Sequence, residues 1–243
     1  MPSLIATERS YSIAVMLEVI SVHFAKAAGT SLYGALLEHY GSSLHVDGNH
    51  DPCNPSHNVK EPVDITSETR AVHGHFRADR YAGIDGSRLI TFLREPVDKL
   101  LSVYFFWKSL PPSGNPDHDR FLNEKPSIIE YARQSAGIAF PAYFGDFDMR
   151  GFDFIGFYDR RREELFELSK LLGFQIDPDL RLNVTPLSDE RIAILGNSRL
   201  LKHLRLILQD DIEFYETVLA QRRNGYLVPT IQKARCRKKD TPN

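Results

Sequence analysis

Short apolar runs and stretches with helical spacing alternate along most of the chain. The apolar runs predict buried strands over 13–24, 71–76, 88–93 and 152–159. Apolar residues at intervals of three and four predict helices over 31–40, 96 to about 108, 127–135, 162–173 and 198–223. Pro96 suits the first turn of its helix, and Gly41 and Gly173 follow the last turns of theirs.

The order of these elements predicts the fold class. Strands that alternate with helices favour an α/β fold with a central parallel sheet and helices on both faces. The 243 residues contain no repeat and no break in composition, so we expect one domain over 1–243. The polar segment 42–70 is expected to be a long loop, as is 111–119. The basic segment at about 230–243 is expected to be a frayed tail.

Composition removes several classes of protein. A net charge of −2 argues against a general nucleic-acid binder. Cys53 and Cys236 are the only cysteines, which excludes a disulfide framework or a cysteine-rich zinc site. No apolar run approaches the ~18 residues that span a bilayer, and the N-terminal segment lacks the order of a signal peptide. We therefore expect a soluble, cytoplasmic protein.

The segment "HFAKAAGTS" at 23–31 lies between the first predicted strand and the first predicted helix. Backbone N–H groups of such a loop bind phosphate, Lys26 adds a cation, and Thr30 and Ser31 add hydroxyl donors. The lysine precedes Gly29 by three residues, whereas in the usual nucleoside triphosphate loop it directly precedes Ser or Thr. An ordinary strand-to-helix turn of small residues fits the same segment.

A second segment, "FLREPVDKLLSVYFF" at 92–106, carries an arginine and a serine eight residues apart. Arg94 follows a predicted strand at its carboxyl end, where ligands of open α/β sheets bind. Ser102 lies about two helical turns further on, roughly on the same side of the helix. A guanidinium and a hydroxyl suit a second phosphate group. Taken singly, each residue also fits a structural position.

The segment "VHGHF" at 72–76 places two histidines on one side of an extended strand. Neutral imidazole suits a general base near pH 7. His73 and His75 also fit a metal-ligand pair or two structural histidines. The metal alternative would draw on upstream residues without fixed ligand spacing, so the base is favoured; those residues are His45, Asp47, His50 and His57.

Together the first two segments resemble the nucleotide-binding motifs of the PAPS-dependent carbohydrate sulfotransferases (PAPS is 3′-phosphoadenosine 5′-phosphosulfate). "AKAAGTS" is similar to the family's "PKTGGTS", with Ala25 for proline and Ala27-Ala28 for Thr-Gly. "LREPVDKLLSVY" is similar to "LREPxxRLLSxY" almost throughout. The His-Gly-His at 73–75 resembles a strand of the heparan and uronosyl 2-O-sulfotransferases, in which the second histidine is the base.

The resemblance implies a P-loop-like fold and transfer of a sulfuryl group from PAPS to a hydroxyl of a carbohydrate or glycolipid acceptor. It implies PAP as the product and no metal. Lys26 would assist the departing PAP, and His75 would be the general base with His73 beside it. The nucleotide-binding residues that it implies are Lys26, Ala27, Ala28, Gly29, Thr30, Ser31, Arg94 and Ser102, joined by Asn183 and Thr185 from a late Asn-x-Thr segment.

The acceptor is not encoded by these motifs. Its expected walls are the segments 42–70 and 108–126, whose basic residues suit an anionic or polar sugar, although a solvated loop explains them equally well. These basic residues include Lys60, Arg70, Lys108 and Arg120, besides several histidines.

Three other function classes remain open. A P-loop small-molecule kinase needs Mg²⁺ and usually an acid at the end of the neighbouring strand, where this chain has Arg94. A non-catalytic nucleotide or carbohydrate binder would keep the fold and lack turnover. A metal-dependent hydrolase is the third alternative.

Overall fold

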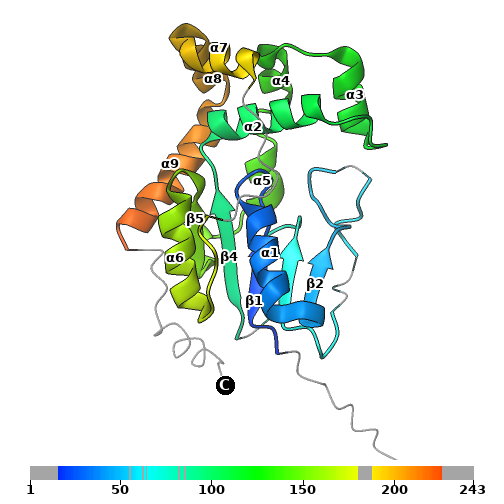
Figure 1. Ribbon diagram of the computed structural model, residues 1–243, viewed down its shortest axis with the longest axis vertical. Helices are drawn as coiled ribbons and strands as arrows, with labels where there is room; N and C mark the ends of the chain where they lie inside the picture. The colour runs from blue at the N-terminus through cyan, green and yellow to red at the C-terminus, as the bar shows by residue number, and fades with distance from the viewer. Residues whose placement is uncertain are drawn as a thin grey trace, which may run out of the picture.

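Five parallel strands form the centre of the protein (Figure 1). The computed structural model describes residues 16–225 except 55, 62, 64, 82, 85 and 180–187. The strands are β1 (Val19–Val22), β2 (Leu44–Asp47), β3 (Ala71–Gly74), β4 (Arg88–Leu93) and β5 (Phe154–Phe157). They lie in the order β2-β3-β1-β4-β5, and each neighbouring pair is parallel. The predicted parallel sheet is confirmed.

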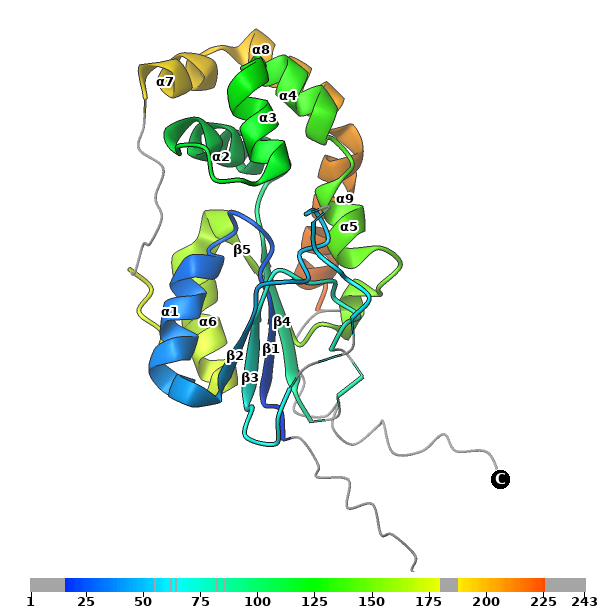
Figure 2. The ribbon, with the colours of Figure 1, turned by 90° about the vertical axis from the view of Figure 1, so that its right-hand side faces the viewer.

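Helices cover both faces of this sheet, as predicted. Figure 2 shows α1 and α6 on one face and α5 and α9 on the other. The other helices gather beyond the carboxyl ends of the strands, where α2 crosses above the sheet. The helices are α1 (Gly29–Tyr40), α2 (Pro96–Ser109), α3 (Pro116–Glu124), α4 (Ile128–Ser135), α5 (Ala139–Phe144), α6 (Arg161–Leu172), α7 (Asp189–Gly196), α8 (Ser198–Ile207) and α9 (Gln209–Arg223).

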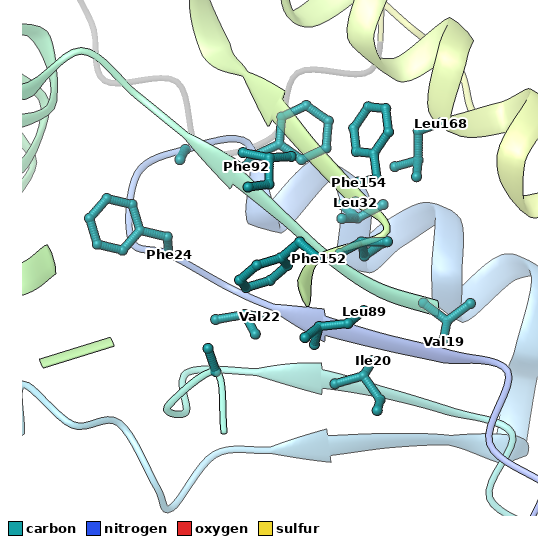
Figure 3. Packing of buried hydrophobic residues seen from close by; sticks show 14 of the residues in the cluster. Val19, Ile20, Val22, Phe24, Leu32, Leu89, Phe92, Phe152, Phe154 and Leu168 are labelled. Carbon is teal, nitrogen blue, oxygen red and sulfur yellow. The ribbon is translucent and has the colours of Figure 1, made fainter. Parts of the chain in front are cut away.

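The sheet is buried on both faces, which explains its continuous apolar runs. Every residue of β1, β3 and β5 is buried, as expected for parallel strands between two helical layers. Figure 3 shows the packing of Val22, Leu89, Phe92, Phe154 and Leu168 in this core. A second apolar cluster holds the helices above the sheet together; its members include Leu101, Phe121, Ala132, Ile194 and Leu204.

The strand order creates a crevice at the carboxyl ends of β1 and β4. The chain leaves β1 through α1 toward β2 at one edge, and it leaves β4 through α2 toward β5 at the other edge. Neighbouring strands whose connections diverge in this way form the usual ligand site of an open α/β sheet. Lys26 follows β1 and Arg94 follows β4, so the fold brings the two predicted phosphate segments to one crevice.

Two predictions about strands need correction. The strand predicted over 13–24 is shorter within the described residues, because β1 ends at Val22 before the loop that follows it. The segment predicted as a loop over 42–70 contains the edge strand β2. An edge strand has one solvent-facing side, and Val46 is 51% exposed. Its apolar signal is therefore too weak to separate it from a loop.

Two predictions for the helical regions also need correction, and two helices were not predicted. The stretch predicted as one helix over 198–223 is two helices that meet at Leu208. Helix α8 packs on the upper apolar cluster and α9 packs on the sheet, and buried Leu208 belongs to the junction. The segment 111–119 is not all loop, since Asn115 caps α3 with its side chain. Short α5 and α7 were not predicted.

Three further expectations concern membrane spans, the C-terminal tail and the number of domains. No helix in the described part of the chain combines the length and apolar character needed to cross a membrane. The tail predicted at about 230–243 lies outside the described residues. The single domain over 1–243 stays a prediction.

Candidate active site

A cavity of about 690 Å³ opens at the carboxyl ends of the strands. Its walls come from the loop after β1, the segment after β2, the end of β3, nearly the whole length of α2, and parts of α3, α4, α5, α6, α7 and α9. Both segments predicted as acceptor walls reach it, the first through Asp51, Cys53 and Asn54 and the second through Asp117 and Arg120. Lys60, Arg70 and Lys108 are not among the described residues that line it.

The loop between β1 and α1 turns tightly around the base of this cavity. Lys26 and Ala28 have φ values of 62° and 75°, in the left-handed region that favours glycine. Ala28 stands where the similar motif has glycine, so the substitution keeps the loop conformation at a cost of about 1 kcal/mol. The side chain of Ala27 turns away and is buried in the core. Ala28, Gly29, Thr30 and Ser31 line the cavity at the N-terminus of α1.

Lys26 is the central cation of the loop. Its ammonium lies 3.8 Å from the centroid of the Phe106 ring, on α2. Burial lowers the pKa of Lys26 to about 8, and the positive charges of Arg94 and Arg191 act in the same direction. Three cationic side chains therefore converge, and an anion between them would relieve their repulsion.

Arg94 connects β4 to the phosphate loop. Its Nη1 donates a hydrogen bond of 2.9 Å to the carbonyl of Lys26, and its Nε donates one of 2.7 Å to Asp98. The guanidinium also lies 3.9 Å from the centroid of the Tyr158 ring. Ser102 is buried on α2 and lines the same cavity. The structure thus brings the two predicted phosphate segments into direct contact.

Arg191 and Lys99 are further cations that line the cavity, and sequence reasoning missed both. Arg191 on α7 has a buried Nε without a hydrogen-bond partner among the described residues, and its Nη2 lies 3.7 Å from Asp98. Arg191 lies six residues after Thr185 of the predicted Asn-x-Thr segment, whose motif does not include it. Lys99 lies on α2, and burial lowers its pKa. It occupies the basic position of "LREPVDKLLSVY", so the motif itself contained the signal.

The two predicted histidines occupy different environments. His75 follows β3 and lines the cavity, where its Nδ1 lies 2.8 Å from the Tyr143 hydroxyl. His73 is buried within the sheet with Nδ1 2.9 Å from Ser21 Oγ, and it is not among the described residues that line the cavity. Burial lowers the pKa of His73 to about 3. His75 is therefore positioned to meet a ligand and His73 is not.

A third histidine, not predicted, completes this group. His23 follows β1 and stacks on His75 with ring centroids 4.1 Å apart, while the His73 ring lies 5.0 Å from the His23 ring at a tilt of 30°. Burial and the neighbouring histidines lower the pKa of His23 well below 6.5. A cluster of three imidazoles is stable when the rings stay neutral, because adjacent positive charges would repel.

Two other parts of the sequence analysis concern the Asn-x-Thr segment and the metal alternative. Asn183 and Thr185 lie outside the described residues. Among the described residues, no group of three or more His, Cys, Asp or Glu side chains could hold a metal ion. His45, Asp47, His50 and His57, the upstream residues of the metal alternative, therefore form no such group with His73 and His75. Asp47 instead pairs with His50 and Arg80.

Comparison with known proteins identifies only distant likenesses. No protein-family model and no curated protein matches the chain. The mouse sulfotransferase SULT7A1 complexed with PAP is similar with a TM-score of 0.37 and 10% identity, over 79% of this chain and 66% of that one. A sulfotransferase from Alicyclobacillus acidocaldarius is similar with a TM-score of 0.37 and 13% identity, over 81% of this chain and 96% of that one. At these values the likeness carries no conclusion about function.

Proposed function

We propose that the protein is a PAPS-dependent sulfotransferase that acts on a hydroxyl of a carbohydrate or glycoconjugate. The contact between Arg94 and the carbonyl of Lys26 carries this proposal. It joins the segment that resembles the 5′-phosphosulfate loop to the segment that resembles the 3′-phosphate motif. A nucleotide with phosphate at both ends of its ribose would meet cations from both segments within one cavity.

The residues of the cavity divide the chemistry between them. Lys26 and the N–H groups at the start of α1 would offset the charge that develops on the departing phosphate oxygen. Arg94 and Ser102 would hold the 3′-phosphate. His75 would take the proton of the acceptor hydroxyl as its oxygen attacks sulfur, and the sulfur–oxygen bond to PAP would break. The cavity volume of about 690 Å³ is within the usual range for small-molecule sites.

His75 is suited to the role of base at neutral pH. Burial lowers its pKa below 6.5, although the Asp51 carboxylate and the backbone of His23 act in the opposite direction. The ring is therefore neutral at pH 7 and can accept a proton. Burial keeps the neighbouring His73 neutral too. The main role of His73 would therefore be to pack against the rings of the other two histidines.

The part of the cavity near His75 carries charges of both signs. The half of the cavity near His75 contains both a cation, Lys99, and carboxylates, Asp51 and Asp211. A polar sugar with several hydroxyl groups would match this mixture of donors and acceptors better than an apolar alcohol.

A transfer assay tests the function. The protein is incubated with ³⁵S-labelled PAPS and a panel of neutral, amino and uronic-acid glycans, beside Lys26→Ala and the surface variant Arg150→Ala. We expect label on at least one glycan class with the parent and Arg150→Ala, and a loss with Lys26→Ala. Transfer of γ-phosphate from ATP with Mg²⁺, in place of sulfuryl transfer, would support the kinase alternative.

A further inference from the structure

His75, Tyr143 and Asp51 form a hydrogen-bonded chain along one wall of the cavity. The three residues come from the end of β3, from α5 and from the segment after β2. His75 Nδ1 lies 2.8 Å from the Tyr143 oxygen, and the Tyr143 hydroxyl donates to Asp51 Oδ1 at 3.0 Å. Tyr143 is only 2% exposed, so its hydroxyl depends on these two partners.

The direction of the chain follows from the number of protons. A phenol has one proton, and a carboxylate can only accept one. The Tyr143 proton therefore lies toward Asp51, and the phenol oxygen accepts from Nδ1–H of His75. Burial raises the pKa of Tyr143 well above 10, so the phenol keeps its proton across the physiological range. In the neutral His75 ring the lone pair is then on Nε2.

Both ends of the chain are held in place. Asp51 Oδ1 accepts a hydrogen bond of 2.9 Å from the Cys53 N–H, and the Asp51 N–H donates to His57 Nδ1 at 3.2 Å. At the other end, the His75 ring has a hydrogen bond with the His23 backbone, and the His23 ring stacks on it with 23° between the ring planes. Rotation of His75 would break the hydrogen bond to Tyr143 and the stacking together.

We propose that Tyr143 and Asp51 are positioning residues that hold His75 in the tautomer with Nδ1 protonated and Nε2 unprotonated. As His75 takes the acceptor proton on Nε2, the Asp51 carboxylate stabilises the imidazolium through the Tyr143 hydroxyl. The acceptor oxygen forms its bond to sulfur, and PAP leaves with the electron pair of the broken bond. The role of His75 as base rests on the proposed function, whereas its tautomer does not.

Nitrogen NMR of ¹⁵N-histidine-labelled protein, without nucleotide, tests the chain directly. The titratable groups around His75 are His23, His57 and His73, besides Asp51 and Tyr143. Spectra at pH 7.5 are therefore assigned by comparison with His75→Ala. We expect Nδ1 of His75 to be protonated and Nε2 to be bare in the parent. A parent spectrum with the proton on Nε2 would overturn the proposal.

Two variants and a matched control complete the test. Tyr143→Phe should give a mixture of His75 tautomers, and Asp51→Ala should free the phenol proton to donate to Nδ1 and shift the ring toward the Nε2–H form. Tyr215→Phe removes another buried tyrosine–aspartate hydrogen bond, outside the cavity, and should leave the His75 signals unchanged. Unchanged His75 signals in a folded Tyr143→Phe or Asp51→Ala protein would also contradict the chain.

Activity measurements then test the hydrogen-bonded chain of His75, Tyr143 and Asp51, here called the relay, separately from the proposed function. With an accepted glycan, kcat of both relay variants should fall at least about 10-fold at nearly parental KM for PAPS, because the wrong tautomer cannot take the proton. The expected NMR result without sulfuryl transfer to any glycan would leave the relay standing and refute the function. Transfer with parental kcat in Tyr143→Phe would refute the relay alone.

Discussion

The imidazole of His23 lies directly against the backbone of Gly29, in the position where any larger residue would place its Cβ. The end of β1 and the start of α1 are thereby packed together, and the loop between them is closed. The His23 ring also stacks on the His75 ring, so one ring contacts both the loop glycine and the proposed base. Gly29 is required by this close approach and not by its own backbone angles.

Gly29→Ala is expected to destabilise the protein by about 1–3 kcal/mol, because its methyl group would overlap the His23 ring. The second change His23→Ala should recover part of the loss in the free energy of unfolding, measured by urea denaturation. Gly196→Ala on α7 is the control: its Cβ meets open space, and it should be neutral or slightly stabilising. A double variant no more stable than Gly29→Ala would refute the contact.

Ala28→Gly is expected to stabilise the protein by about 0.5–1 kcal/mol. Ala28 has a φ of 75°, and glycine removes the steric cost of that conformation while adding some backbone entropy to the unfolded chain. The same change restores the glycine of the similar motif and should leave PAP affinity equal or improved. Thermal and urea unfolding measure the effect, and a clear loss of stability would mean that the loop does not adopt this conformation.

The affinity for PAP is expected to fall above pH 8. Lys26 has a pKa of about 8, so it is a cation below that pH and neutral above it, while phosphate groups are already fully ionised there. The dissociation constant should be flat from pH 7 to 8 and rise by up to about tenfold per pH unit beyond. Lys26→Arg keeps its positive charge, so its dissociation constant for PAP, measured by calorimetry, should stay constant up to pH 9.5. A parental profile in Lys26→Arg would remove Lys26 from the phosphate site.

His75→Ala and Lys26→Ala are expected to fail in different ways. Loss of a general base costs about 10²–10⁴-fold in rate and leaves nucleotide binding nearly untouched. His75→Ala should therefore bind PAP like the parent and turn over slowly, whereas Lys26→Ala should lose both affinity and rate. His73→Ala should bind PAP normally and lose stability, since His73 is buried in the sheet. Near-parental single turnover in His75→Ala would assign the base elsewhere.

Much of this arrangement could be predicted from the sequence because it is local. The phosphate loop and the Arg94 segment are contiguous motifs at strand ends, and the strand order brings them together. Tyr143, Asp51 and Arg191 could not be found in this way. Tyr143 and Asp51 reach the cavity from segments without a motif, and Arg191 lies outside the Asn-x-Thr motif that precedes it. Their partners lie 68, 92 or more positions away along the chain, as in the His75–Tyr143 and Tyr143–Asp51 pairs.

The edge strand and the helix junction were missed for a related reason. Leu44 and Val46 alone do not make an apolar run, and pairing with β3 supplies what the local pattern lacks. The apolar positions on both sides of Leu208 continue at helical spacing, so only their packing on two different clusters reveals the break.

Comparison of PAP with AMP tests the central claim most directly, because the two nucleotides differ only in the 3′-phosphate. Calorimetry at pH 7.5 should give a dissociation constant at least about 10-fold lower for PAP than for AMP in the parent and in Arg150→Ala, since a charge-assisted hydrogen bond is worth about 1.5–3 kcal/mol. Arg94→Ala should bring the two constants together. Equal affinities in the parent, tighter binding of ATP with Mg²⁺, or a preference for PAP that survives in Arg94→Ala would contradict the account.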